Sequence, residues 1–142
     1  MISKSKIKYF RSLKHKKYRK LGNEFLIEGT RIVSAALEEN TSLKTVFITD
    51  AFKCSTSSQH ILKDLDRVKI SIKVVNNRTM KSIATTEHPP GIAGVCSLPK
   101  PQNNFIQTKQ PFIFLDTISD PGNMGTILRS ASWFGVQNVA LS

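Results

Sequence analysis

The sequence predicts an α/β protein, because short apolar runs typical of strands alternate repeatedly with stretches that have helical periodicity. A second observation is a run of prolines and polar turn formers, Pro99-Lys-Pro-Gln-Asn-Asn104, which is typical of a linker. A third is the length of 142 residues, which leaves about 80 residues before this run and about 30 after it. We therefore expect two α/β parts joined by a linker.

The first predicted strand is 25–27, and the first predicted helix is 30–39. The strand is the apolar run Phe25-Leu-Ile27. In the helix, four apolar side chains recur at a spacing that places them on one face: Ile32, Val33, Ala36 and Leu37. Asn40 is a residue type that often ends a helix.

Three further strands and two helices complete the first part. The strands are 45–49, 70–75 and 92–98, which are short apolar runs rich in β-branched residues. The helices are 57–66 and 78–84, whose apolar faces consist of Ile61, Leu62 and Leu65, and of Met80, Ile83 and Ala84. This repeated alternation predicts an α/β sandwich with a mostly parallel sheet.

The second part begins with a predicted buried strand, 112–115, and ends in a helical pattern that runs to Phe134. Between them lies a cluster of turn residues, Asp120-Pro-Gly-Asn123. The first N–H groups of a helix lack partners within it, so this turn predicts a site for an anionic or ribose-phosphate ligand. Arg129 lies four residues after Gly125 on the same helix face, and its side chain should lean back over that glycine toward Asn123.

Both polar side chains of this predicted site also have a structural interpretation. Asn123 could be the N-cap of the helix, because asparagine is among the best residues for that position. Arg129 could pair with a carboxylate, and Asp116 and Asp120 are close enough in the sequence to serve. The sequence leaves these alternatives open.

Residues 120–135 resemble the first signature of the SpoU/TrmH RNA ribose methyltransferases; they read Asp-Pro-Gly-Asn-Met-Gly-Thr-Ile-Leu-Arg-Ser-Ala-Ser-Trp-Phe-Gly. The fixed positions of that signature fall on Asn123, Gly125, Arg129 and Gly135. Upstream, 25–33 and 89–95 are similar to the two ends of the family's N-terminal substrate-binding domain. The resemblance implies an α/β substrate-binding domain of ribosomal-protein-like fold, followed by the first β-α-β of a truncated, knotted and dimeric methyltransferase domain.

This resemblance also implies how the chain is divided. It predicts a basic segment at 1–20, an RNA substrate-binding domain at 21–98, a linker at 99–110 and an incomplete catalytic domain at 111–142. In the family, two later signatures form the pocket for S-adenosylmethionine. We therefore expect no cofactor-binding residue within this chain, which should be inactive alone.

The resemblance assigns Asn123 and Arg129 as the catalytic pair of the complete enzyme. That enzyme would transfer a methyl group from S-adenosylmethionine to a ribose 2′-hydroxyl of ribosomal or transfer RNA. A guanidinium stays protonated in proteins, so we expect Arg129 to hold a phosphate or orient the ribose oxygen instead of removing a proton.

The positive charge of the chain is concentrated at its N-terminus. Nine of the 21 lysines and arginines fall in residues 1–20, where aspartate and glutamate are absent, so this segment holds +9 of the net charge of +11. Such segregation predicts a polyanionic partner, here RNA. The predicted RNA-binding residues of the segment are Lys4, Lys6, Lys8, Arg11, Lys14, Lys16, Lys17, Arg19 and Lys20.

The aromatic residues of this segment have two interpretations. Tyr9, Phe10 and Tyr18 alternate with the charges and could stack on unpaired bases. Alternatively, the segment is a solvated basic helix that docks on the protein body through Ile7, Phe10 and Leu13. The two interpretations are compatible.

Two charged residues after the first strand are harder to assign. Glu28 is interpreted mainly as a strand-end carboxylate that pairs with Arg31 or another basic residue. Arg31 is a further RNA-binding candidate, and it could equally do no more than pair with Glu28.

Several classes of protein are disfavoured. Cys54 and Cys96 are too few for a disulfide framework and lack metal-site spacing, and no histidine has a second ligand nearby, so we expect no metal site. The glycines around 120–125 do not form the dinucleotide-binding pattern. A signal peptide and a membrane span are not recognisable, which favours a cytoplasmic protein.

Two functions other than the methyltransferase stay open. One is a non-catalytic RNA-binding module of ribosomal-protein-like fold, and the other is an interaction protein whose basic segment meets an acidic protein.

The second part of the chain should need a partner that covers its apolar face, because a single β-α-β leaves that face open. Its residues that need a partner are Phe112, Phe114, Leu128, Trp133 and Phe134.

Overall fold

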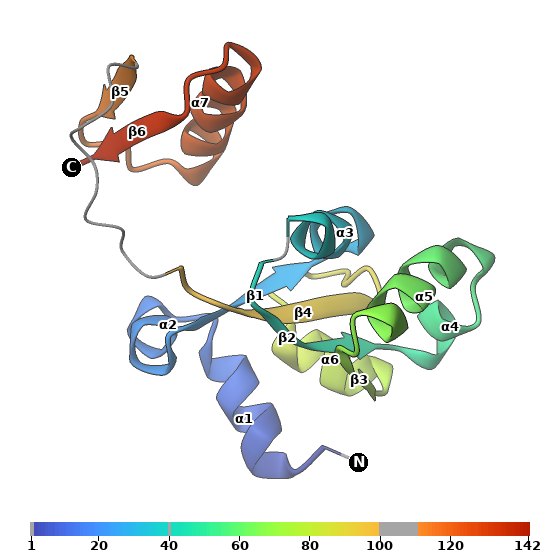
Figure 1. The fold of residues 1–142 in the computed structure, drawn as a ribbon. Helices are drawn as coiled ribbons and strands as arrows, with labels where there is room; N and C mark the ends of the chain where they lie inside the picture. The colour runs from blue at the N-terminus through green and yellow to red at the C-terminus, as the bar shows by residue number, and fades with distance from the viewer. Residues whose placement is uncertain (1, 40, 100–110) are drawn as a thin grey trace. The chain divides into compact units, whose positions relative to one another are not determined.

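The computed structural model describes residues 2–39, 41–99 and 111–142, and it divides the chain into two compact units, Met1–Pro99 and Lys100–Ser142 (Figure 1). Asn40, the expected end of a helix, lies outside the described residues, as does the predicted linker apart from Pro99. Every helix within the described ranges is too short or too polar to cross a membrane.

The first unit contains a four-stranded sheet with the strand order β1-β4-β2-β3. The strands are β1 (Glu24–Glu28), β2 (Leu43–Ile48), β3 (Ser71–Val74) and β4 (Ile92–Ser97). β2 and β3 are parallel, whereas β4 is antiparallel to both of its neighbours. The prediction of a mostly parallel sheet is therefore wrong. The apolar run of β4 arises because both of its faces are buried. A strand buried on both faces has such a run whichever way it points, so the run did not determine the direction of β4.

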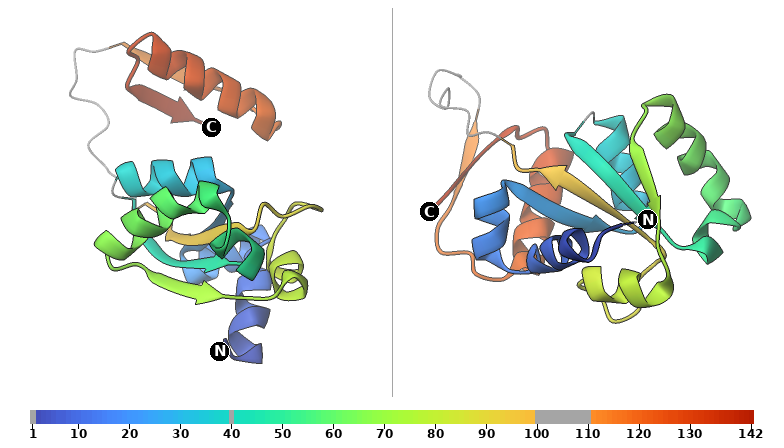
Figure 2. Two further views of the ribbon diagram at one scale, coloured as in Figure 1. Left: turned by 90° about the vertical axis from the view of Figure 1, so that its right-hand side faces the viewer. Right: turned by 90° about the horizontal axis from the view of Figure 1, so that it is seen from below.

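Helices cover both faces of this sheet (Figures 1 and 2). On one face lie α3 (Thr30–Glu38) and α5 (Gln59–Arg67), and on the other lie α1 (Lys4–Ser12) and α6 (Asn77–Ile83). Three shorter helices connect these elements: α2 (Lys16–Gly22), α4 (Asp50–Lys53) and the 3-10 helix η1 (Thr56–Ser58). The predicted strands and helices of the first part are thus all present, with ends that shift by at most two residues.

The core consists of two clusters, one on each face of the sheet. Successive side chains of a strand point to opposite faces, so β2 contributes Ile48 to one cluster and Phe47 to the other. The first cluster also holds Val33 of α3 and Leu65 of α5, and the second holds Met80 of α6. All five side chains are at most 2% exposed, which ties the helices on both faces to one central strand.

The second unit is a β-α-β, as predicted. It consists of β5 (Phe112–Leu115), α7 (Pro121–Trp133) and β6 (Asn138–Leu141), and the two strands are parallel. Few of its apolar side chains are buried: Phe112 is 68% exposed, Trp133 90% and Phe134 86%. The expectation that this part leaves an apolar surface uncovered is confirmed for the described residues.

Candidate nucleic-acid interface

The turn that precedes α7 is fixed by Asp120. Its carboxylate accepts a hydrogen bond of 2.8 Å from the backbone N–H of Asn123, which makes Asp120 the N-cap of the helix. Pro121 occupies the first helical position, where its fixed φ and missing N–H are tolerated. Asn123 is therefore the third residue of the helix, and the interpretation of Asn123 as the cap is wrong. Its side chain is exposed and is not needed to start the helix.

Arg129 leans back along α7, but not over Gly125 as expected. Its Nη2 donates a hydrogen bond of 3.3 Å to the hydroxyl of Thr126, which in turn donates to the carbonyl of Gly122 at 3.0 Å. A Cβ placed on Gly125 would meet no other group within 4 Å. The hydroxyl of Thr126 is an available acceptor, whereas Gly125 has no side chain to offer one.

The carboxylates that could have paired with Arg129 are both engaged elsewhere. Asp120 caps α7, and Asp116 accepts hydrogen bonds from the hydroxyls of Ser142 at 2.7 Å and Thr117 at 3.0 Å, which together lower its pKa. Within the described residues, Arg129 makes no ion pair with a carboxylate. Its guanidinium is exposed, so it is accessible to an anionic ligand.

The basic segment forms α1, α2 and the turn between them. Seven of its nine cations are exposed, and none of the nine forms an ion pair with a carboxylate in the described part of the chain. Lys14 and Arg19 are half-buried. Arg19 donates to the carbonyls of Leu13 at 3.1 Å and Lys14 at 2.7 Å, and thereby joins α2 to the end of α1. Arg19 thus has a structural role, and the seven exposed cations are available to phosphates.

The apolar side of α1 docks on the sheet. Leu13 is 1% exposed, and the ring of Phe10 packs edge-on against Phe47 with 4.8 Å between the ring centres. The hydroxyl of Tyr9 donates to Glu24 at 2.7 Å. Burial, together with the hydrogen bond and negative charge of Glu24, raises the pKa of Tyr9 to about 12.

Of the three aromatic residues predicted to stack on bases, two are therefore engaged by the protein body, Tyr9 and Phe10. Tyr18 is 42% exposed, and its ring has only an edge contact with His15. The docking interpretation of the segment is confirmed for Phe10 and Leu13, whereas docking of Ile7 and stacking on RNA stay predictions.

Glu28 holds the loop that leads into β4. It accepts hydrogen bonds from the backbone N–H and the hydroxyl of Thr85, both at 2.6 Å, and from the same two groups of Thr86, at 3.4 and 2.7 Å. Burial acts to raise the pKa of Glu28, but these four bonds outweigh it and lower the pKa. Glu28 forms no ion pair with Arg31, so the pairing predicted for it is wrong.

Arg31, at the start of α3, has an exposed side chain without a carboxylate partner among the described residues. It is thus available to RNA, although contact stays a prediction. The partner that Glu28 has instead could not be found from the sequence, because Thr85 and Thr86 are more than 50 residues away.

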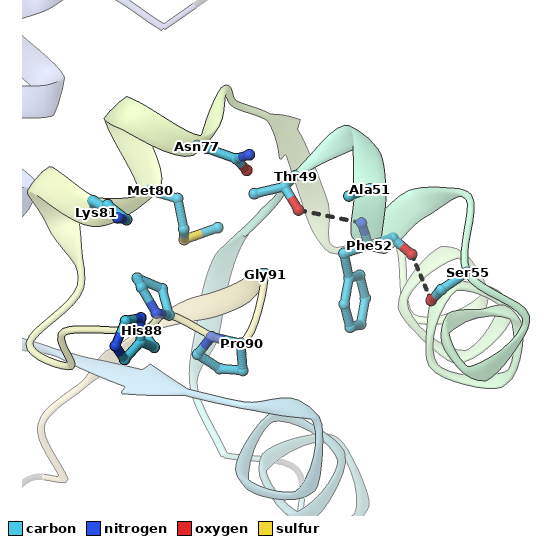
Figure 3. A pocket seen from close by; sticks show the side chains of 11 residues that line it. Thr49, Ala51, Phe52, Ser55, Asn77, Met80, Lys81, His88, Pro90 and Gly91 are labelled. Atoms are coloured by element: carbon cyan, nitrogen blue, oxygen red, sulfur yellow. Dashed lines mark hydrogen bonds between the residues drawn. The ribbon is translucent and has the colours of Figure 1, made fainter.

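A hollow near the loop that leads into β4 was not predicted from the sequence. It has a volume of about 540 Å³ and lies between the end of β2 with α4, the helix α6, and the loop at 88–91 (Figure 3). The segment 49–55 lies more than 20 residues before the other two, and the segment 89–95 that resembles the family gave no indication of a hollow.

The chain is similar to known proteins in its family match, its sequence and its structure. The family model of the MRM3-like substrate binding domain matches residues 4–94. The 23S rRNA (guanosine(2553)-2′-O)-methyltransferase RlmP of Bacillus subtilis is 31% identical over 136 residues, covering 96% of this chain and 50% of that protein. Human mitochondrial rRNA methyltransferase 3 is 30% identical over 139 residues, covering 92% of this chain and 31% of that protein.

Two solved structures have a similar fold. The SpoU methyltransferase AviRb of Streptomyces viridochromogenes, in complex with AdoMet, has a TM-score of 0.83 at 21% identity, covering 98% of this chain and 53% of that one. A putative RNA methyltransferase of the TrmH family from Porphyromonas gingivalis has a TM-score of 0.71 at 28% identity, covering 99% and 52%. The α/β fold class is thereby confirmed. The chain spans half or less of the length of the two curated relatives described above.

Proposed function

Since the chain belongs to the family of MRM3-like substrate-binding domains, we propose that it is the RNA-recognition part of a 2′-O-ribose methyltransferase. The relatives RlmP and rRNA methyltransferase 3 support ribosomal RNA as the substrate, with transfer RNA as the alternative. The methyl group would come from S-adenosylmethionine. Methyl transfer is proposed for a protein of the relatives' length, and residues 1–142 are expected to be inactive alone.

The accessible guanidinium of Arg129 is the observation that carries this proposal. A structural arginine normally has a carboxylate partner, and both nearby carboxylates bind other groups. Arg129 would hold the reacting nucleotide by a phosphate or the ribose oxygen, and Asn123 would assist with its exposed carboxamide. Positioning of this kind is the main contribution that the chain's own residues could make to methyl transfer.

The described residues do not by themselves fit S-adenosylmethionine. That molecule carries an amino group, a carboxylate and a sulfonium, which need charged or strongly polar partners. A hollow of about 430 Å³ beside α7 and β6 is lined by seven residues, of which only Ser132 and Gln137 have polar side chains. In a protein of the relatives' length, S-adenosylmethionine would therefore be held mainly by residues other than 1–142.

Three further properties are proposed for a protein of the relatives' length. The exposed apolar side chains of the second unit support burial against the rest of a catalytic domain, and the family resemblance supports a homodimer formed through that domain. Seven exposed cations of α1 and α2 support phosphate binding by the first unit. A cytoplasmic location stays a prediction.

A non-catalytic RNA-binding module is the second candidate function. One observation favours it. The family model that matches is that of a substrate-binding domain, and its match at 4–94 lies entirely within the first unit. Methyl transfer distinguishes the two candidates, since a module of this kind would support none.

The experiment is a chimera in which this chain replaces the matching half of Bacillus subtilis RlmP. We expect the chimera to methylate ribosomal RNA, and we expect Arg129→Lys to lower the rate about a hundredfold, because lysine cannot reproduce a bidentate hold. Methyl incorporation from labelled S-adenosylmethionine measures this. Thr126→Ala is the matched control, since it removes the hydrogen-bond partner of Arg129 but leaves the guanidinium and its charge in place. If Arg129→Lys were as active as the unsubstituted chimera, the role assigned to Arg129 would be wrong.

A further inference from the structure

The hollow of about 540 Å³ in the first unit is formed by three segments that the sheet brings together (Figure 3). Thr49 and Phe52 come from the end of β2 and from α4, whereas Asn77, Met80 and Lys81 come from α6. The third segment is the loop at 88–91. Its volume falls in the range of roughly 300–1,000 Å³ that is typical of pockets for small organic ligands.

Part of the lining of the hollow is apolar. It is built from the ring of Phe52, the thioether of Met80 and the ring of Pro90 (Figure 3). Gly91 has a φ of +78°, and a Cβ there would lie 3.0 Å from Cβ of Phe52 and 3.1 Å from Oγ1 of Thr49. Any other residue would therefore be strained and would crowd the inner end. Aromatic, thioether and proline groups of this kind are suited to a flat, apolar-faced ring.

The rim of the hollow is polar and free to bind. Asn77, Lys81 and His88 are exposed, and none of their side chains makes a hydrogen bond or ion pair within the described ranges. The cap of α6 is the neighbouring Asn76, which accepts from the N–H of Thr79 at 2.8 Å. The carboxamide of Asn77 is thus left with both a donor and an acceptor available.

The charge at the rim favours a ligand that carries a negative charge next to its flat ring. Lys81 is a cation on the rim, and no carboxylate lines the hollow. Asp50 and Glu87 lie beside lining residues in the sequence but are exposed and do not line it. A flat ring, a hydrogen-bonding edge and a neighbouring negative charge together describe a nucleotide.

We propose that this hollow binds one unstacked nucleotide of the RNA substrate. The base stacks on the half-buried ring of Phe52 above the buried side chain of Met80, Asn77 hydrogen-bonds its edge, and Lys81 binds the adjoining phosphate. This proposal rests on the proposed function, since it assumes an RNA substrate. It adds that the substrate presents a single-stranded nucleotide to the first unit, in addition to the nucleotide held by the second.

Methionine methyl groups give a direct readout in the whole chain. The sequence contains three methionines, and only Met80 lines the hollow. We expect a short single-stranded RNA of mixed sequence to shift the NMR signal of the Met80 methyl, because a stacked base exerts a ring current on it. The same RNA annealed into a duplex should leave that signal in place. Uridine and adenosine monophosphates form a third arm of the experiment. If either mononucleotide bound the chain as tightly as the RNA does, the assignment of the hollow to RNA would be wrong.

Filling the hollow provides the variant test. Ala51→Trp places a large ring at the exposed edge of the hollow without removing a core residue or a charge. We expect it to weaken binding of the single-stranded RNA about tenfold, the order of effect of losing one stacked base. Gln59→Trp is the matched control, since Gln59 is exposed at the start of α5 and does not line the hollow.

The outcomes separate this inference from the proposed function. If the chain binds the RNA while the Met80 signal stays unmoved, the hollow is not a nucleotide site, whatever Ala51→Trp does to folding. The same conclusion follows if Ala51→Trp folds and binds RNA as tightly as Gln59→Trp. If neither single-stranded nor duplex RNA binds the unsubstituted chain, the proposed function falls together with this inference.

Discussion

Glu28 shows how one side chain can position a loop of the candidate interface. Its carboxylate accepts four hydrogen bonds from Thr85 and Thr86, just ahead of the residues that line the hollow. The pKa of Glu28 is lowered, so its contribution to stability is present above the unfolded-state pKa and is lost as the pH falls through the folded-state pKa. The loop should therefore be held firmly at neutral pH and released in acid.

Substitution of Glu28 by glutamine tests this contribution. The amide keeps the shape but loses the charge and part of the acceptor capacity, so we expect Glu28→Gln to lower the free energy of unfolding by about 1–2 kcal/mol at neutral pH. The difference from the unsubstituted chain should shrink in acid, as the native carboxylate becomes protonated. Urea unfolding at several pH values measures it.

Glu38→Gln is the matched control for this experiment. Glu38 is exposed on α3, and its side chain makes no hydrogen bond or ion pair within the described residues. A pH-independent loss of stability in Glu28→Gln would show that the charge of Glu28 is not what holds the loop.

At the scale of elements, the pair α1 and α2 both packs on the sheet of the first unit and carries exposed cations. Leu13 is buried and Phe10 packs on Phe47, so deletion of the segment would open the core as well as remove the cations. Neutralising exposed lysines separates the two roles, because their side chains contribute little to stability.

We expect glutamine at five exposed lysines of this pair to weaken RNA binding and flatten its salt dependence. The log–log slope should fall by about 0.7 for each lost phosphate contact to single-stranded RNA. Fluorescence anisotropy at several salt concentrations measures this. The substituted positions are Lys4, Lys8, Lys16, Lys17 and Lys20.

A matched control removes similar charges elsewhere on the first unit. Lys63 and Lys69 are exposed and lie outside the basic segment. Glutamine at these two positions should leave the slope nearly unchanged. Because the control removes two charges and the first variant removes five, a flattening two-fifths as large in the control would mean that RNA responds only to the net charge of the chain and not to the pair α1 and α2.

At the scale of the whole molecule, the two units differ in how well they cover their apolar residues. The first unit buries one cluster on each face of its sheet. The second has one helix and two strands, and it leaves Phe112, Trp133 and Phe134 between 68% and 90% exposed. A surface of this kind is typical of a site that associates with more protein.

We therefore expect the chain to bind an apolar fluorescent dye or to self-associate. Replacing Trp133 and Phe134 together by glutamine should lower dye fluorescence and shift the chain toward the monomer in analytical ultracentrifugation. Leu21→Gln is the control, since Leu21 is 79% exposed but belongs to the first unit. A monomer that binds no dye would show that the second unit's apolar surface is covered within the chain.

Local sequence patterns were sufficient for much of this fold. Helical spacing predicted α3, α5 and α6, whereas α7 starts earlier than predicted, because Pro121, Gly122 and Asn123 of the predicted turn lie in its first turn. The cap was misassigned because Asn123 and Asp120 are both good cap residues, and Pro121 decides between them. Local patterns suffice where neighbours along the chain make the contact.

By itself, the sequence determined the strands and the longer helices of the first unit's sheet layers, where the positive charge is concentrated and which family the residues 120–135 resemble. Only the tertiary structure decided the direction of β4, the partner of Glu28 and the existence of the hollow. The physical reason is range: periodicity and capping act over a few residues, whereas these three features join segments whose separation along the chain leaves no local trace.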